Sequence, residues 1–536
     1  MLHKSSRICL TALVAAVFAA GSALAQQPDV NKALIDLLVK KGVLSQQDVS
    51  SLQQEVAAEQ QAQAAQQAAQ AQQATTTTVT TSSGPSYAGG GPAYSGASGA
   101  GVPVPNAKGG TSPLSFKIGI ADFTPFGFMD FTSVYRNEAT GSSIGTSFNS
   151  IPYSNGSTGQ LSETKFSAQN SRVGLRVDSV VNDTKVLGYL ETDFLGNAPT
   201  NLFVTSNADT LRMRNYFVDV KNGPWELLAG QDWSLIVPNR VGISPIPSDI
   251  FYTNNMDTNY QIGLTWARQP QIRLVYHATD ELTFALSLEN PDQYVGGQAV
   301  LPAAFTGTEV DTGAATSQPN IFPDVIGKVA FDTKAVNGLP WHFELTGLVS
   351  SFKINTYSAT VNTDATAEGE GVEASVNLEL VKGFHFIATD FYSYGGGRYI
   401  FGSGPDFIVT PPDASGAYGI GLVKATSTIL GAEWTVVPVD TVSAYWSTAG
   451  YGQRYDKVGA TYVGYGYPTG PNSQNKTIDE LTLANTYTFW KNPSYGALQL
   501  IGQVSYVDRK PWYVAAGTPS KANATMVFLD LRYVLP

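Results

Sequence analysis

Arginines and carboxylates that recur at every second position are the feature of this sequence with the clearest chemical potential. Arg172 and Arg176 alternate with Val173 and Leu175, and Glu191 follows the same pattern further along. A period of two predicts β-strands that carry a charged face and an apolar face. A guanidinium group is permanently charged and can hold a carboxylate or a phosphate through two hydrogen bonds. The charged face could therefore attract small anions.

Two groups of residues on this charged surface are expected to contact solute. The residues on the predicted strands would line a water-filled passage: Arg172, Arg176, Arg212, Arg214, Arg273, Glu191 and Asp193. The residues in the third long loop would form a constriction: Arg240, Asp249 and Asp257. A series of weak cationic sites lowers the barrier for an anion that leaves water, without binding it so tightly that it stops.

Ion pairing within the same surface is the main alternative interpretation of these charges. The acidic residues close in sequence to the arginines could neutralise them: Glu191, Asp193, Asp219, Glu226 and Asp232. By their spacing, Glu226 and Asp232 could also point to the opposite face of their strand. Charged side chains cost little in a wet interior, so a paired set would give a non-selective pore.

Catalytic chemistry is not expected from this chain. Outside the N-terminal segment the histidines are His277, His342 and His385, each on a predicted strand. None of the three lies beside a nucleophile or metal motif of the G-x-S-x-G, H-E-x-x-H or C-x-x-C type. We expect no catalytic residue, no cofactor and no metal. The net charge of −11 also argues against a nucleic-acid partner.

The elements that must position the charged face are expected to form an all-β transmembrane barrel of about 16 antiparallel strands. Only 14% of the residues are charged, 11% are aromatic, and there are 52 glycines, which suits a barrel with aromatic girdles and glycine-rich turns. Short turns and long loops alternate along the chain. The sixth strand is expected over 260–277 with a bend at Pro270, because proline is tolerated at a bulge. Counts of about 14 or 18 strands stay open.

The N-terminus predicts a secretory signal peptide over residues 1–25. Lys4 and Arg7 precede an apolar stretch, and an A-x-A cleavage site ends at Ala25. The single cysteine, Cys9, lies inside this segment, so the mature chain would contain no disulfide and no thiol chemistry.

Two further segments separate the signal peptide from the barrel domain, which is expected over 114–536. Residues 26–73 carry apolar residues at three- and four-residue spacing, which predicts a short α-helical coiled coil. A partly helical, low-complexity spacer is the alternative. Residues 74–113 are rich in Thr, Ser, Gly and Pro and are expected to form a flexible linker.

Seven local patches carry a resemblance to a known family. They read ALIDLLVKKGVLS at 33–45, SRVGLR at 171–176, ETDF at 191–194, LRMRNY at 211–216, AGQDWS at 229–234, RQPQIR at 268–273 and LRYVLP at 531–536. In this order they resemble the DcaP-like trimeric outer-membrane porins, which are related to the phosphate-selective porin O/P family. One departure is the end of the chain. Outer-membrane barrels commonly end in an aromatic residue, whereas this chain ends in Pro536, three residues after Tyr533.

The resemblance implies a sixteen-stranded homotrimeric porin in the outer membrane of a Gram-negative-type cell. It also implies that the N-terminal helix forms a coiled coil in the periplasm and that the third loop folds into the barrel. The expected function is a water-filled channel through the lipid for passive diffusion of small hydrophilic solutes, leaning towards small organic anions. A non-conducting barrel that anchors the envelope is the alternative.

Overall fold

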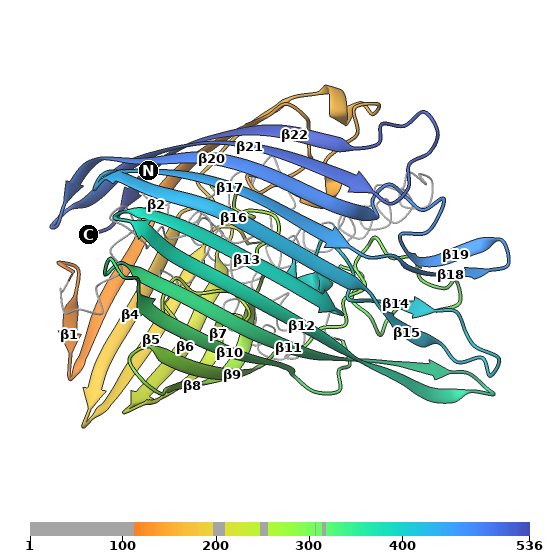
Figure 1. The fold of residues 1–536 in the computed structure, drawn as a ribbon, viewed down its shortest axis with the longest axis horizontal. Coiled ribbons are helices and arrows are strands. Elements are labelled where there is room, and N and C mark those ends of the chain that lie inside the picture. The colour runs from red at the N-terminus through yellow and green to blue at the C-terminus, as the bar shows by residue number, and fades with distance from the viewer. Residues whose placement is uncertain (1–111, 197–208, 247–255, 306, 314–317) are drawn as a thin grey trace, which may run out of the picture. The chain divides into compact units, whose positions relative to one another are not determined.

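A computed structural model describes residues 112–196, 209–246, 256–305, 307–313 and 318–536. The expected signal peptide, the expected coiled coil and all but the last residues of the expected linker lie outside the described residues. The described residues belong almost entirely to the expected barrel domain (Figure 1).

Sixteen antiparallel strands in the described part of the chain form a closed barrel, in agreement with the expected fold. Closure occurs at β2, which pairs with β4 on one side and with the last strand, β22, on the other. The wall consists of β2 (Ala121–Arg136), β4 (Arg172–Val181), β5 (Thr184–Asp193), β6 (Arg212–Asn222), β7 (Trp225–Trp233), β8 (Arg268–His277), β9 (Leu282–Glu289), β10 (Asp324–Lys334), β11 (Pro340–Tyr357), β12 (Asn362–Val381), β13 (Phe384–Tyr394), β16 (Lys424–Val437), β17 (Asp440–Tyr451), β20 (Asn475–Asn492), β21 (Gly496–Pro511) and β22 (Ala522–Val534).

Several small elements lie outside this wall. Two short strands pair with β2, and two hairpins extend from the loop end of the barrel (Figure 1). These elements are β1 (Phe116–Ile118), β3 (Glu163–Ser167), the hairpin of β14 (Phe407–Thr410) and β15 (Gly419–Leu422), the hairpin of β18 (Arg454–Val458) and β19 (Thr461–Tyr465), and the 3-10 turns η2 (Phe148–Ser150), η3 (Thr158–Gln160) and η5 (Gly397–Tyr399). The described residues include no helix that is long and apolar enough to cross a membrane.

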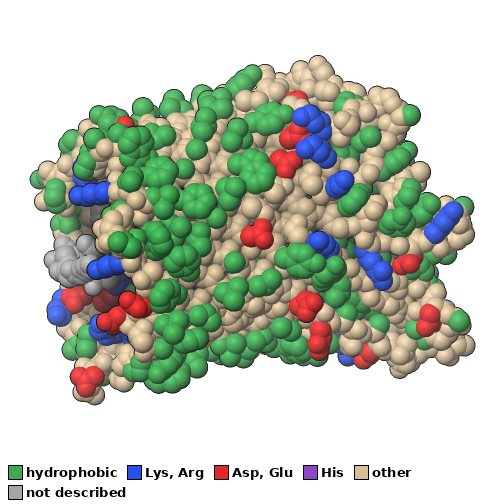
Figure 2. All heavy atoms as spheres, in the orientation of Figure 1, with side chains coloured by type: hydrophobic (Ala, Val, Ile, Leu, Met, Phe, Trp, Pro, Cys, Tyr) green, Lys and Arg blue, Asp and Glu red, His purple; other side chains and the backbone are tan. Residues whose placement is uncertain are grey.

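The alternation of side chains separates an apolar outside from a mixed inside. On β22, Val527 and Leu529 are exposed, whereas Phe528, Asp530 and Arg532 are buried. The other wall strands repeat this pattern, and apolar side chains cover much of the outer surface (Figure 2). Polar side chains thus collect inside the barrel while the outer face suits a hydrocarbon environment.

Short connections predominate at one end of the barrel and long loops at the other, where the four-residue turn 358–361 between β11 and β12 is an exception. Seven connections of two to five residues join strands at one end: 182–183, 223–224, 278–281, 335–339, 382–383, 438–439 and 493–495. The C-terminus lies at the same end, where Pro536 accepts a hydrogen bond from Ser112 at 2.7 Å. This arrangement follows the predicted alternation of turns and loops except at 358–361, where β11 and β12 extend to a tight turn in place of the expected long loop.

The sixth strand is shorter than the sequence predicts. It begins at Arg268, while residues 260–267 belong to the third long loop. Tyr260, Ile262, Leu264 and Trp266 alternate with smaller or polar residues, which imitates a strand. All four side chains are at most 7% exposed, however, because they pack inside the barrel rather than against lipid.

Candidate functional site

The described parts of the third long loop, residues 234–246 and 256–267, lie inside the barrel. In its first half, Arg240 holds both carboxylate oxygens of Glu433 on β16 through its two Nη atoms, each at 2.8 Å. The backbone amide of Asn239 donates to Glu344 on β11, and that of Gly242 donates to Asp332 on β10. Inward-facing carboxylates of three strands therefore fix this part of the loop.

The second half of the loop is held by another sector of the wall. The amide of Ile262 donates to the Glu480 carboxylate on β20 at 2.8 Å. Asp257 accepts hydrogen bonds from the amide of Thr146 in the first loop at 2.9 and 3.1 Å. Burial raises the pKa of Asp257 above its ordinary range, although Arg136 opposes the shift. The described parts of the loop are thus anchored to β10, β11 and β16 and, further along the wall, to β20.

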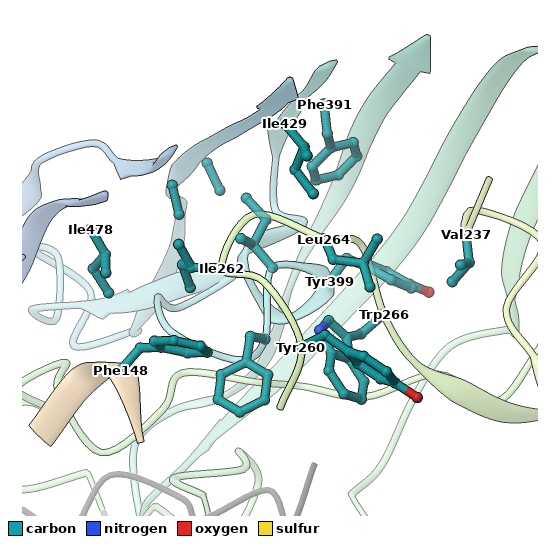
Figure 3. Close-up of a cluster of buried hydrophobic side chains, with 14 of the residues drawn as sticks. Phe148, Val237, Tyr260, Ile262, Leu264, Trp266, Phe391, Tyr399, Ile429 and Ile478 are labelled. Atoms are coloured by element: carbon teal, nitrogen blue, oxygen red, sulfur yellow. The ribbon is translucent and has the colours of Figure 1, made fainter. Parts of the chain in front are cut away.

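An apolar cluster stabilises the loop inside the barrel. Figure 3 shows Tyr260, Ile262, Leu264 and Trp266 from the loop packed near Phe148, Tyr399 and side chains of the wall. The ring centroids of Tyr260 and Trp266 are 5.3 Å apart. Burying this much apolar surface holds the loop more firmly than its few polar contacts could alone.

Five predicted site residues meet on β4, β5 and β6, and we call them the arginine–acid cluster: Arg172, Arg212, Arg214, Glu191 and Asp193. Arg172 lies 3.3 Å from Glu191. Asp193 accepts from Arg212 at 2.6 Å and from Arg214 at 2.9 Å. Arg214 also donates from Nε to Glu191. The cluster assembles because facing residues of adjacent strands, such as Arg172 and Asp193, are paired in register.

The arginine–acid cluster is almost completely buried and carries an excess of positive charge. Arg172 and Arg214 are each 1% exposed, and both carboxylates are fully covered, whereas the Arg212 side chain is 16% exposed. Arg268, at the start of β8, lies within electrostatic range of Arg212, Arg214 and Asp193. Its guanidinium stacks over Trp233 at 5.1 Å. With Arg268 included, four guanidinium groups share two carboxylates.

The remaining predicted strand arginines also have acidic partners. Arg176 makes two 2.7 Å contacts with Asp178. Arg273 lies 3.5 Å from Asp232 and donates to the backbone carbonyl of Trp233 at 2.5 Å. The prediction of ion pairing therefore holds for the geometry of these arginines.

The other predicted acidic residues can also be placed. Glu226 and Asp232 share the inward face of β7, so the suggestion that they point outward is wrong. Glu226 contacts Lys221 at 3.1 Å and His277 at 2.9 Å. Asp249 lies outside the described residues.

A second charged group was not found by sequence reasoning. The guanidinium of Arg398 contacts Asp406 at 2.7 Å and also Asp324 at the start of β10. The hydroxyl of Tyr399 donates to Asp324 at 2.5 Å, and its carbonyl accepts from the Trp266 amide at 2.8 Å. This group joins the loop 395–423 to the third loop. Arg398 and Asp406 lie in a loop without periodicity, so no pattern marked them.

One local motif shows why serine chemistry is not supported. Residues 141–145 read GSSIG, which has the spacing of a nucleophile motif that sequence reasoning did not single out. Its central residue, Ser143, donates to the side chain of Gln169 at 2.8 Å rather than to a histidine. The three strand histidines instead contact acids, lysine or an amide: His277 with Glu226 and Lys221, His342 with Asp332, and His385 with Asn377.

Comparison with known proteins places this fold among outer-membrane channels. No family model and no curated protein sequence matches the chain. The crystal structure of the outer membrane channel DcaP of Acinetobacter baumannii is 18% identical and covers 79% of this chain and 100% of its own, with a TM-score of 0.56. The anion-selective porin from Comamonas acidovorans is 13% identical and covers 77% of this chain and 100% of its own, with a TM-score of 0.44.

Salmonella typhi OmpF in complex with daunomycin is more distant, at 10% identity and a TM-score of 0.41, covering 78% of this chain and 100% of its own. Of these three structures, DcaP has a TM-score above 0.5, and at 18% identity the similarity concerns the fold. It confirms the resemblance seen in the sequence patches at that level. The chain has the fold of the DcaP outer membrane channel.

Proposed function

We propose that this protein is an outer-membrane porin that forms a water-filled channel for passive diffusion of small hydrophilic solutes. The observation that carries the proposal is a closed barrel with an apolar outer face, a charged inner face and a long loop packed inside it. A barrel of sixteen strands is wide enough to hold both a folded loop and a passage beside it. A homotrimer, a signal peptide and a periplasmic coiled coil are further parts of this proposal.

A preference for small organic anions is the finer part of the proposal. Its support is the arginine–acid cluster together with Arg268, where positive charge exceeds negative charge beside the third loop. Elsewhere acidic side chains outnumber Lys and Arg among the buried charged residues. The preference would therefore depend on this one cluster rather than on the whole interior.

Single-channel conductance in a planar bilayer, with the reversal potential measured under a KCl gradient, tests the proposal. We expect stepwise openings and a potential that favours chloride. Replacing Arg212 and Arg214 together with alanine should reduce that preference, and the same change at exposed Lys510, which pairs with Asp479 at 3.0 Å outside the cluster, serves as the control. Openings that favour potassium would retain the porin and reject the anion preference.

A non-conducting barrel that anchors the envelope is the second candidate. It is favoured by the dense packing of the third loop and the near-complete burial of the cluster. This candidate predicts that folded, purified protein inserts into the bilayer without any openings. Openings by the unmodified protein would reject it.

A further inference from the structure

A cleft of about 650 Å³ lies on the outer surface of the barrel at its loop end. Tyr394 at the end of β13, Lys424 at the start of β16 and Arg454 at the start of β18 line it, together with Ile420 and Leu422 of β15. Tyr394 and Lys424 point outward, since Ser393 and Ala425 beside them are buried. The cleft is therefore separate from the interior of the barrel and from the third loop.

The two cations of this cleft have no carboxylate within ion-pairing distance in the part of the chain that the structure describes. Both Lys424 and Arg454 are exposed. The ammonium group of Lys424 lies 4.6 Å from the ring centroid of Tyr392, an outward-facing neighbour of Tyr394. A cation over an aromatic face keeps its charge and remains able to donate hydrogen bonds to a ligand.

The backbone beneath Arg454 is shaped to admit its side chain. A Cβ atom at Gly421 would lie 2.5 Å from Nε of Arg454 and 3.3 Å from its Cγ. In this position the arginine lies across β15 in the space that a side chain at residue 421 would occupy. The position of the guanidinium thus depends on the absence of a side chain on the neighbouring hairpin.

The height of the cleft on the barrel indicates the type of ligand. Below it, the outward residues of β16 include exposed Leu430 and Trp434, which belong to the apolar outer face. At the cleft this face gives way to tyrosines and cations, and basic side chains appear on the outer surface near the loop end (Figure 2). In a membrane, the boundary between apolar and charged surface lies at the level of the lipid head groups.

We propose that this cleft binds the phosphorylated head group of an anionic lipid in the leaflet that surrounds the loop end of the barrel. Lys424 and Arg454 contact the phosphate, while Ile420, Leu422 and Tyr394 contact the apolar part that follows it. Phosphate oxygens accept hydrogen bonds from both cation types, and arginine can do so through two donors. This inference rests on the proposed outer-membrane porin function, because that function places the barrel in a lipid leaflet.

Native mass spectrometry of the detergent-purified, full-length protein, titrated with bisphosphorylated lipid A, tests the proposal. The Lys424→Ala/Arg454→Ala variant should bind the lipid about 30-fold more weakly, because each basic residue near an anionic lipid contributes roughly fivefold. Gly421→Val should weaken binding by displacing Arg454 while leaving both charges in the chain. Lys457→Ala is the matched control, since Lys457 lies on the same hairpin strand but over Tyr462, away from the cleft.

Competition and conductance separate the remaining outcomes. Neutral phosphatidylethanolamine should show no difference between the variants, and excess inorganic phosphate should only partly displace lipid A. Equal lipid A binding by the double variant and the unmodified protein would overturn the proposal. So would phosphate binding without lipid retention, which would indicate a site for a soluble anion. Channel openings in preparations that retain no lipid would reject the lipid site alone, while lipid retention without openings would reject the porin function alone.

Discussion

Two sectors of the barrel wall use charge in different ways. In the sector β4–β8, the arginine–acid cluster and Arg268 bring four guanidinium groups to two carboxylates. In the sector β10–β16, the cations at the third loop have carboxylate partners: Lys328 of β10 lies 3.0 Å from Glu344, and Arg240 of the loop itself lies 2.8 Å from Glu433. In the first sector guanidinium groups outnumber the carboxylates that they contact, whereas in the second sector the charges hold the loop.

This difference shows that a charged inward face does not by itself indicate a solute site. Lys328 also donates to the carbonyl of Val237 in the loop at 2.8 Å, and Glu344 accepts from the loop amide of Asn239. These contacts satisfy buried groups that would otherwise be costly. The two sectors differ in the ratio of cationic to anionic side chains that contact one another. This ratio can be altered by replacing one residue at a time.

The largest effect is expected when the loop anchor is removed. Arg240→Ala leaves the Glu433 carboxylate buried with the Tyr445 hydroxyl as a remaining partner. Breaking a buried ion pair in this way costs about 3–5 kcal/mol of folding free energy. We expect a lower thermal unfolding temperature and larger, noisier conductance as the loop leaves the interior. Arg176→Ala is the control because its partner Asp178 is 42% exposed, and an equal loss in both variants would contradict the special role of the anchor.

A smaller, pH-dependent effect is expected where the loop 395–423 meets β10. Burial raises the pKa of Asp406 from 3.8 to about 7, despite the nearby Arg398, which Asp324 also shares. Asp406 ionises less readily in the folded protein than in the unfolded chain. Its contribution to the free energy of unfolding is therefore largest below pH 3.8 and is lost as the pH rises to about 7.

Hydrogen exchange measures this effect directly. After correction for the intrinsic pH dependence of exchange, amides of 395–423 should become less protected between pH 4 and 7, and Asp406→Asn should flatten the change. Amides of β20, which does not contact Asp406, serve as the internal reference. A pH response that is identical in the variant would rule out Asp406 as its source.

Selectivity should shift in opposite directions when one charge is neutralised in the β4–β8 sector and another at the β20 anchor of the third loop. Arg268→Gln reduces the positive excess beside the cluster, so the chloride-to-potassium permeability ratio should fall. Glu480→Gln removes a negative charge on β20 but keeps an oxygen that can accept from the Ile262 amide, so the ratio should rise. Each shift should be about two- to fivefold, since a unit charge at a few ångströms in a wet pore contributes roughly 0.5–1 kcal/mol. Shifts of the same sign would show that these two sites do not differ in function.

The smallest effect is expected at an exposed ion pair. Lys510 lies 3.0 Å from Asp479 and is 48% exposed. Solvent screens such pairs, which contribute about 0–1 kcal/mol. Lys510→Ala should therefore leave thermal unfolding and selectivity close to those of the unmodified protein. A large destabilisation would mean that charge pairs on the outside matter as much as those that hold the loop.

Much of the barrel could be predicted from the sequence because successive side chains of a strand point to opposite faces, and their polarity matches the environment of each face. The strand of Arg172 and the last strand, with Leu529, Asp530 and Leu531, each show which face meets lipid and which faces inward. The prediction that the sixth strand begins at residue 260 was wrong because the same alternation occurs in the loop. There, Tyr260, Ile262, Leu264 and Trp266 are apolar at every second position. Periodicity records burial, but it does not say whether a residue is buried by lipid or by a loop inside the barrel.

The sequence was enough to predict which residues of the candidate site face inward, but not which of them pair with one another. Alternation was enough to place Arg172, Arg214, Glu191 and Asp193 on inward faces, because it acts within each strand. Their pairing depends on register between strands, including the irregularity at Glu191 and Thr192 between β5 and β6. The contacts of Arg240 with Glu433 and of Arg398 with Asp324 join residues far apart in the chain.

The sequence by itself determined the alternation of strands and turns, the apolar outer face and the list of inward charges. Only the tertiary structure decided which of those charges neutralise one another, which hold the third loop and which remain in excess. The physical reason is that side-chain direction is a local property of the backbone, whereas the energy of a charge depends on every group that reaches it through space.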